Sequence, residues 1–364
     1  MTLAGRKRLY TTITVVGLVL AFCVAYILPL ERRLSTFDPW QTGDWLINFS
    51  AGPVRRGLLG EAIFSVTSDG SSAVIAVTVL QTSLALLLFL FVGALYLQSD
   101  RTPAWIMLVL SPAFLLFLPL DTLANARKEL IALTALAGAA YSYRLGRANV
   151  GLWLALPFFV AGVFSHEGLV VTAPAFAFLI WTALPRRRAW PLLSAYAAAT
   201  LGALFLAVFR PGGASAVGTI CESWASRGIV DCSGSLSTLA VPLEVMTNHL
   251  WNELFPTYWI YLLPAGLAVI PLFAVRFLPR QWKVSLLVLT ACAPLFFIAW
   301  DYGRWLFLIT SQLSLLALAR SRDLRPLRVP LYGAGLFVLV WGMDHWAEPI
   351  RHGVFVRILN LFVS

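Results

Sequence analysis

Residues 72–98, SAVIAVTVLQTSLALLLFLFVGALYLQ, form a long apolar run without a charged side chain. A helix rises ~1.5 Å per residue, so this run is long enough to cross the ~30 Å hydrocarbon core of a bilayer. The whole chain shares this character: of its 364 residues, 59% are hydrophobic and 12% charged, and the mean hydropathy is +0.81. Soluble domains carry about 25% charged residues. The composition therefore excludes an ordinary soluble enzyme, a disordered chain and a disulfide scaffold, and it predicts a polytopic membrane protein.

The predicted fold is an all-α transmembrane bundle of about eleven spans. Besides 72–98, the predicted spans are 11–30, 104–120, 129–143, 149–164, 168–184, 189–209, 257–275, 284–300, 305–319 and 329–343. Several are shorter than the ~20 residues of an upright span, so tilt or local bilayer thinning is expected. Residues 1–364 form one predicted domain, in which 31–71 is an outer, interfacial segment and 210–256 a large outer loop.

Lysine and arginine divide unequally between the two sets of loops that these spans define. One set carries 16 of the 27 basic residues and two acidic residues, whereas the other carries 11 basic and 15 acidic residues. Cytoplasmic loops are enriched in Lys and Arg, so the first set is predicted to be cytoplasmic, together with the N-terminus. The second set then faces the periplasm. The net charge of +10 is therefore explained by the basic residues of the predicted cytoplasmic loops. For this reason nucleic acid is not an expected partner.

The four cysteines fall into two kinds of place. Cys23 and Cys292 lie within predicted spans, whereas Cys221 and Cys232 both lie in the large outer loop. Two cysteines on the oxidising side of the membrane predict one disulfide, with two free thiols as the alternative. The sequence has no CxxC pair, HExxH, Walker loop or GxGxxG. Neither a metal site nor a nucleotide cofactor is therefore expected.

Ionisable residues gather on the predicted outer side, many of them where the chain turns back into the membrane. Helix N-termini there carry unpaired N–H groups and a partial positive charge, and neighbouring arginines would complete a site for an anion. At headgroup depth that anion is a lipid phosphate or diphosphate. The alternative is that each arginine reaches its own headgroups. The residues concerned are Asp38, Asp44, Arg55, Arg56, Arg127, Lys128, Glu129, His166, Glu167, Asp301 and Arg304.

The order of these residues resembles the EpsG-type and Wzy-type polysaccharide polymerases of bacteria. Those proteins show an early outer segment with aspartate and aromatic residues and a Gly/Glu-containing start of a membrane segment. An arginine, a histidine and a further arginine follow at later outer turns. The matching positions here are Asp38 to Trp45, Gly60–Glu61, Arg127, His166 and Arg304. The sparse pattern covers roughly residues 38–305 and leaves out Arg55–Gly57, Lys128–Glu129, Glu167 and the cysteine-bearing loop.

The resemblance implies a Wzy-like transmembrane bundle, with a GT-C-like bundle as the alternative, and glycosyl transfer at the periplasmic face of a bacterial inner membrane. The donor would be a saccharide linked to a polyprenyl (di)phosphate, and the most specific form would be polymerisation of O-antigen-like repeat units. The implied partners are this lipid-linked saccharide, membrane lipids and a chain-length regulator or other polysaccharide assembly proteins. No cofactor is implied.

The same resemblance assigns roles to the outer residues. Arginines would bind the diphosphate and stabilise the charge that develops on it, and a carboxylate or imidazole would accept the proton of the attacking hydroxyl. The predicted diphosphate-binding residues are Arg127 and Arg304, followed by Arg55, Arg56, Lys128 and Asp301. The candidate bases are Glu129, Glu167, Asp44 and His166, the last favoured because the usual pKa of histidine lies near neutral pH.

Three other functions are considered. A GT-C-type glycosyltransferase, which uses a polyprenyl-monophosphate sugar, would depend on an acidic residue of the first outer loop, Asp38 or Asp44. A lipid or solute transporter would place polar residues midway along its spans, and the predicted spans are close to free of them. A non-catalytic envelope-assembly subunit would tolerate replacement of Arg127 by alanine.

Overall fold

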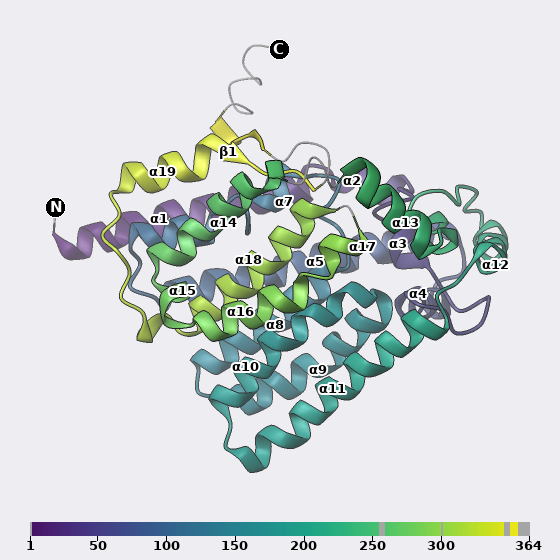
Figure 1. Cartoon of the computed structure of the whole chain (residues 1–364). Coiled ribbons are helices and arrows are strands. Elements are labelled where there is room, and N and C mark those ends of the chain that lie inside the picture. Colours follow the sequence, from purple (N-terminus) through teal and green to yellow (C-terminus); the bar gives the residue numbers. More distant parts are fainter. Residues whose placement is uncertain (1, 255–258, 300, 346–349, 356–364) are drawn as a thin grey trace.

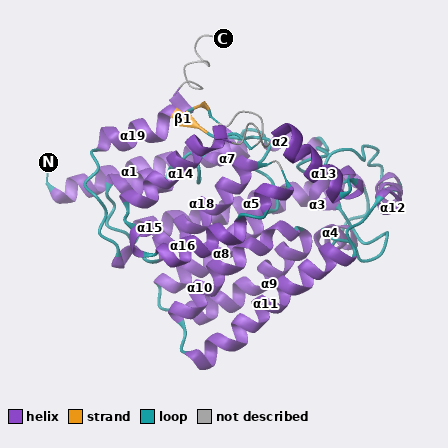
Figure 2. Ribbon diagram, in the orientation of Figure 1, coloured by secondary structure: helices purple, strands orange, loops and turns teal. Residues whose placement is uncertain are grey.

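The computed structural model of the protein describes residues 2–254, 259–299, 301–345 and 350–355 (Figures 1 and 2). In this part of the chain nearly every element is a helix. Four helical segments are long and apolar enough to cross a membrane: Ala4–Ser35, Gly70–Leu97, Ala148–Ser165 and Arg186–Phe209. The predicted helical architecture with apolar helices of membrane length is thus confirmed at this level.

Two long helices near the N-terminus pack against each other. Helix α1 (Leu3–Phe22) continues through a π-helical turn (Cys23–Ile27) to the short helix α2 (Leu30–Ser35), and α5 (Gly70–Leu97) lies beside α1. The start of α5 is fixed locally by a capping box, in which Asp69 accepts the N–H of Ser72 and the Ser72 hydroxyl accepts the N–H of Asp69.

The centre of the bundle is built around α8 (Glu129–Arg144) and α18 (Tyr302–Ala319). Every residue of α18 is buried, and α8 packs against α5, α18 and α9 (Ala148–Ser165). The contact between α8 and α9 is close, because a Cβ at Gly151 would lie only 2.1 Å from the Cβ of Ser142. Small residues allow helices to approach in this way. The predicted spans 129–143 and 305–319 therefore correspond to helices enclosed by protein.

Several predicted spans are interrupted by breaks in the helix. Proline removes a backbone donor and disfavours helix at the residue before it, and Pro112 and Pro294 lie at two of the breaks. The span 104–120 is split into α6 (Pro103–Val109) and α7 (Phe117–Leu120), and 284–300 into α16 (Trp282–Cys292) and α17 (Leu295–Ile298). The span 168–184 begins as a 3-10 helix (Glu167–Thr172) and continues as α10 (Ala173–Ala183).

The last predicted spans are also shorter than expected. Helix α14 (Leu262–Ala274) replaces 257–275, whose first two residues lie outside the described part, and is followed by the short α15 (Phe277–Arg280). Helix α19 (Leu331–Val340) replaces 329–343 and ends in strand β1 (Trp341–Gly342), which pairs antiparallel with β2 (Arg351–His352). This small hairpin was not predicted.

The two segments that were predicted to lie on the outer side, 31–71 and 210–256, fold together at the end of the bundle away from the N-terminus (Figure 1). The segment predicted to be interfacial forms α3 (Gly43–Leu46) and α4 (Leu58–Val66), and residues 41–48 are buried inside the protein. The large loop follows α11 (Arg186–Phe209) and forms α12 (Ala214–Ala225), a 3-10 turn (Ser237–Ala240), α13 (Leu243–His249) and a π-helical turn (Leu250–Leu254).

A disulfide joins Cys221 of α12 to Cys232, with the Cα atoms 5.6 Å apart. Trp224 of the same helix packs on Phe37 and donates its indole N–H to the carbonyl of Leu46 at 3.0 Å. The disulfide-bonded loop therefore covers the segment that contains α3.

Thiol labelling on intact cells tests the predicted orientation. Val245 on α13 is 56% exposed, and Arg187 is exposed at the start of α11. We expect Val245→Cys to react with an impermeant thiol reagent and Arg187→Cys to react only after permeabilisation, with the unsubstituted protein as the background control. The reverse pattern would overturn the orientation.

Candidate functional site

Ten charged or titratable residues come together where α3, α8, α9 and α18 meet, and we call them the charged cluster. These residues lie close enough for their charges to change one another's pKa values. The charges of Arg56, Arg127 and Lys128 lower the pKa of Asp44. The charge of Arg304 lowers the pKa values of Arg56 and Arg127 relative to what they would be without it. Five cations face four carboxylates, which leaves one positive charge uncompensated. The members are Asp44, Arg55, Arg56, Arg127, Lys128, Glu129, His166, Glu167, Asp301 and Arg304.

A buried ion pair joins the starts of the two central helices. Arg304, in the first turn of α18, pairs with Glu129, the first residue of α8, and with Asp301 just before α18. The side chains of Arg304 and Glu129 are 6% and 5% exposed. Removal of one partner from such a pair leaves an uncompensated buried charge and costs about 3–5 kcal/mol. Arg304 therefore stabilises the fold as well as contributing charge to the cluster.

Lys128 and Asp44 form the innermost pair of the cluster. The ammonium of Lys128 is fully buried, lies 3.7 Å from Oδ1 of Asp44 and donates to the carbonyl of Ser165 at 2.7 Å. Burial lowers the pKa of Lys128 to about 8. Burial alone would raise the pKa of Asp44, but the positive charge around it, chiefly on Lys128, holds that pKa below its usual range. Asp44 is thus ionised at neutral pH.

His166 caps the C-terminal end of α9, and its ring nitrogens have distinct roles. Nδ1 accepts the backbone N–H of Gly168 at 3.1 Å. Burial, and then the positive charge of Arg56, lower the pKa of His166 to about 4. The ring is therefore neutral at pH 7 and carries its proton on Nε2. The near-neutral pKa for which His166 was favoured as a base is wrong, because burial was not visible in the sequence. In this state Nε2 is a hydrogen-bond donor.

Arg55 and Arg56 share one carboxylate. Arg56 contacts both oxygens of Glu167 at 2.8–3.1 Å, and Arg55 contacts Oε1 at 3.1 Å. Arg56 has a backbone φ of 70°, a left-handed conformation that costs a non-glycine residue about 1–2 kcal/mol. These contacts tie the turn before α4 to the end of α9, so both guanidinium groups and Glu167 are already engaged with one another.

Arg127 is held differently from the other arginines. Its Nη1 donates to the carbonyl of Trp40 at 2.8 Å and to the hydroxyl of Ser235 at 3.0 Å, and the guanidinium lies 5.5 Å from the Trp40 ring centroid. These partners are neutral. Ser235 follows Cys232 by three residues, so the disulfide-bonded loop supports Arg127. The sequence analysis did not identify Ser235 as a partner of Arg127. The only local signal for Ser235 was its position three residues after Cys232.

Four buried polar atoms of this region have no hydrogen-bond partner within the described structure. They are Oδ2 of Asp44, Oγ of Ser165, Nε of Arg127 and Nε of Arg304. Buried polar atoms are nearly always paired in folded proteins, so these four unpaired atoms, three in the charged cluster and one on the adjacent Ser165, indicate capacity for a polar ligand. Two cavities of the described structure lie elsewhere, one beside the start of α5 and one beside the start of α1.

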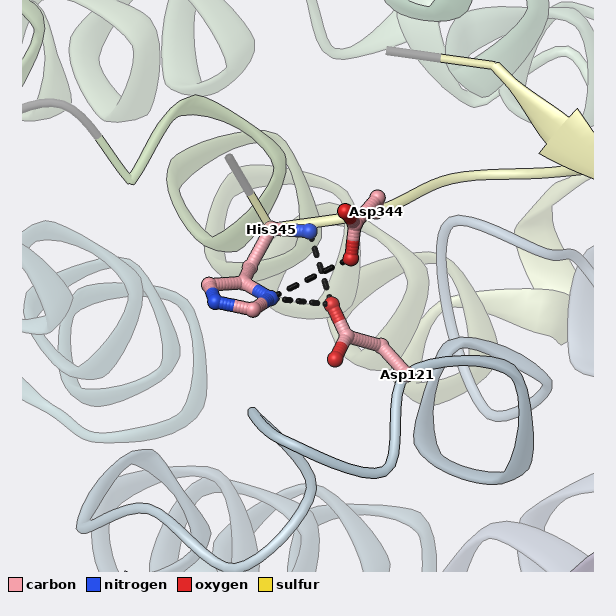
Figure 3. A group of neighbouring side chains, drawn as sticks. All are labelled: Asp121, Asp344 and His345. Carbon is pink, nitrogen blue, oxygen red and sulfur yellow. Dashed lines mark hydrogen bonds and ion pairs between the residues drawn. The ribbon is translucent and has the colours of Figure 1, made fainter. Parts of the chain in front are cut away.

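A second buried group consists of Asp121, Asp344 and His345, whose side chains are shown in Figure 3. It lies beside the start of α18. Nδ1 of His345 is 2.8 Å from Oδ2 of Asp121 and 3.2 Å from Oδ1 of Asp344, and the N–H of His345 donates to Asp121 at 2.7 Å. The other oxygen of Asp344 pairs with Arg351 at 2.9 Å. The carbonyl of His345 accepts the N–H of Gly303 at 2.9 Å. Hydrogen bonds of His345 therefore connect the chain after β1 to Asp121 and to the start of α18.

The same three side chains offer a donor set for a divalent cation. One oxygen from each aspartate and Nδ1 of His345 all lie within 4.8 Å of one another, and carboxylates with imidazole are common metal ligands. A metal would have to displace the proton on Nδ1. No metal site was expected from the sequence. Asp121 was missed there because its only local signal is an aspartate directly after a predicted span.

His345 makes the stability of the protein depend on pH in a predictable direction. Burial alone would lower its pKa, but the hydrogen bonds to Asp121 and Asp344 raise it from 6.5 to about 9. A pKa raised in the folded state gives stabilisation that is complete below pH 6.5 and is lost as the pH rises through about 9. The loss is at most about 3 kcal/mol.

Thermal unfolding of the wild type and of His345→Asn between pH 6 and 10 checks this expectation. Lys128 titrates in the same range in both proteins, so the difference between the two curves isolates His345. We expect that difference to shrink with rising pH, and a constant difference would contradict the expectation.

The fold and these two groups define an all-helical protein with apolar helices of membrane length and a buried, mainly cationic cluster at one end. Comparison with known protein families, with curated proteins and with solved structures gives no match.

Proposed function

We propose that the protein is a glycosyltransferase that acts at the outer face of the bacterial inner membrane on a polyprenyl-(di)phosphate-linked saccharide, most specifically in the polymerisation of repeat units. The supporting observation is that Asp44, Arg127, Lys128, His166 and Arg304 converge in one buried cluster that carries excess positive charge and unpaired polar atoms. A buried cluster of this composition suits an anion that carries a reactive bond.

The proposed reaction is displacement at the anomeric carbon of the donor. A hydroxyl of the acceptor forms a new C–O bond to that carbon, and the bond from the carbon to the phosphate oxygen breaks. The phosphate leaves with the electron pair, and the hydroxyl proton passes to a base. Charge that develops on the leaving oxygen is stabilised by positively charged donors held in a dry site. We assign this role to Arg127 and Arg304, with Lys128 beside them.

We assign the base to Asp44. Its Oδ2 is buried without a hydrogen-bond partner in the described structure, whereas Glu129 and Glu167 are paired with arginines. General bases of this kind contribute about 10²–10⁴-fold to rate. His166, with its proton on Nε2, suits donation of a hydrogen bond to the saccharide or to the leaving phosphate.

A second candidate is a GT-C-type glycosyltransferase that uses a polyprenyl-monophosphate sugar. The central position of Asp44 favours it, because such an enzyme depends on an acidic residue of the first outer loop. Asp38 is the less suitable of the two aspartates, since its Oδ1 accepts the N–H groups of Trp40 and Gln41 at 2.8 and 2.7 Å and so shapes a turn.

Reconstitution with defined donors separates the two candidates. Purified protein in lipid nanodiscs is supplied with a polyprenyl-diphosphate-linked repeat unit in one reaction and with a polyprenyl-monophosphate sugar in another, and products are resolved by chain length. The polymerase proposal predicts a ladder of products from the diphosphate donor alone. Single-sugar transfer from the monophosphate donor would instead support the second candidate. Consumption of neither donor would contradict both.

A further inference from the structure

A cationic pocket lies at the opposite end of the bundle from the charged cluster. It has a volume of about 460 Å³ and is lined by Ala4, Lys7, Arg8, Thr11, Thr12 and Arg101. These residues belong to the first turns of α1 and to the connection between α5 and α6. Helix α1 and the π-helical turn that follows it run from this pocket to Tyr26, whose hydroxyl donates to the carbonyl of Asn125 next to the cluster. At ~1.5 Å per residue, the two places are about 30 Å apart.

The three cations of the pocket have no ion-pair partner among the described residues. Two other basic residues at this end have partners: Arg320 pairs with Asp323 at 2.6 Å, and Arg144 donates to the carbonyl of Gln98 at 2.6 Å. Asp100 is the neighbouring acidic residue, and its side chain is exposed. Three unpaired cations around one cavity favour an anion, and the volume is within the ~300–1,000 Å³ of ligand pockets.

Arg101 provides an independent indication. Its φ of 51° is in the left-handed region, where residues other than glycine are strained. Its Nε is also buried without a hydrogen-bond partner in the described structure. The chain therefore keeps an arginine with an unsatisfied polar atom at a position where glycine would be unstrained. Strained residues of this kind concentrate at ligand sites.

We propose that Lys7, Arg8 and Arg101 bind the phosphate of an anionic phospholipid headgroup. The pocket opens beside the first turns of a membrane-length helix, which is where phospholipid headgroups lie. Basic pockets between helices at the cytoplasmic side of membrane proteins are suited to such headgroups. Free phosphate offers the same chemistry, so the test must separate the two sources. The proposal is independent of the reaction proposed for the charged cluster.

The test compares lipid binding by two triple variants of the full-length protein in neutral detergent. The pocket variant is Lys7→Gln, Arg8→Gln and Arg101→Gln. The control variant, Arg186→Gln, Arg187→Gln and Arg188→Gln, also removes three positive charges from the basic loops, and its three arginines are exposed and do not line the pocket. Binding of phosphatidylglycerol, phosphatidylcholine and inorganic phosphate is measured by titration.

We expect the wild type and the control variant to bind phosphatidylglycerol at least about tenfold more tightly than the pocket variant, because each basic residue contributes about a fivefold gain in affinity. Phosphatidylcholine should bind equally weakly to all three proteins. Equal phosphatidylglycerol affinity in the pocket variant and the wild type would overturn the proposal. Binding of inorganic phosphate without binding of phosphatidylglycerol would overturn the assignment to a lipid.

Arg101→Gly gives a readout that a misfolded variant could not imitate. Glycine accepts the left-handed backbone without strain, so the lipid-free variant should unfold at the same temperature as the wild type or at a higher one. Its affinity for phosphatidylglycerol should fall. A variant that keeps full lipid affinity would contradict the role given to Arg101.

Discussion

Asp44→Asn should reduce glycosyl transfer per folded molecule by about 10²–10⁴-fold, since this is the range that a general base contributes. Asparagine keeps the shape of the side chain and an oxygen toward Lys128, which lies 3.7 Å from Oδ1 of Asp44, but it cannot accept the proton of the attacking hydroxyl. The measurement is the initial rate with the lipid-linked donor, with thermal unfolding recorded on the same preparation.

Asp38→Asn is the matched control for this substitution. Asp38 lies in the same segment, 31–71, and uses its carboxylate to accept two backbone N–H groups, a contact that an asparagine oxygen can also make. Its rate should stay within a few-fold of the wild type. A similar rate for Asp44→Asn and the wild type would remove Asp44 from the mechanism.

Arg304→Ala should destabilise the protein by about 3–5 kcal/mol, because it leaves the carboxylate of Glu129 buried without its partner. Lower yield and a lower unfolding temperature are therefore expected before any effect on chemistry can be read. The double variant Arg304→Met with Glu129→Gln should recover part of this stability, since Glu129 no longer carries a charge without a partner. The recovery is partial because Asp301, whose side chain is 24% exposed, also loses its pair with Arg304. Failure of the double variant to recover any stability would show that the ion pair is not the source of the loss.

Arg127→Gln offers the cleaner test of anion binding. The partners of Arg127 in the described structure are a carbonyl, a hydroxyl and an aromatic ring, so its replacement leaves no carboxylate unpaired among them. We expect the unfolding temperature to change little and transfer to fall by about 10²–10³-fold, the range for loss of one preorganised donor. Loss of folding with proportionate loss of activity would instead make Arg127 a structural residue.

The composition of the chain predicted which segments are helical. It did not predict where the helices break or which of them are enclosed by protein. The run 72–98 appears as α5 almost unchanged, because it has a capping box before it and no interior proline. The run 104–120 is equally apolar but is broken around Pro112, which hydropathy does not detect. The apolar segments that became α8 and α18 are enclosed by protein, and an apolar side chain suits lipid and protein interior equally well.

The members of the charged cluster were visible in the sequence because most of them stand at predicted helix starts. Their pairing was not visible, since Arg304 and Glu129 are 175 residues apart. The same holds for the second buried group, in which His345 and Asp121 are 224 residues apart. No local pattern encodes such contacts. The protonation state of His166 could not be predicted from the sequence either, because the burial that lowers its pKa arises only when α9 packs in the bundle.

Binding of a short-chain polyprenyl diphosphate tests most directly whether the charged cluster holds a lipid-borne phosphate. The assay uses protein that already carries Lys7→Gln, Arg8→Gln and Arg101→Gln, so that the pocket at the other end does not contribute. We expect Arg127→Gln in this background to weaken binding at least about tenfold, and the matching polyprenol not to compete. Equal affinity with and without Arg127, or equal competition by the alcohol, would contradict the account.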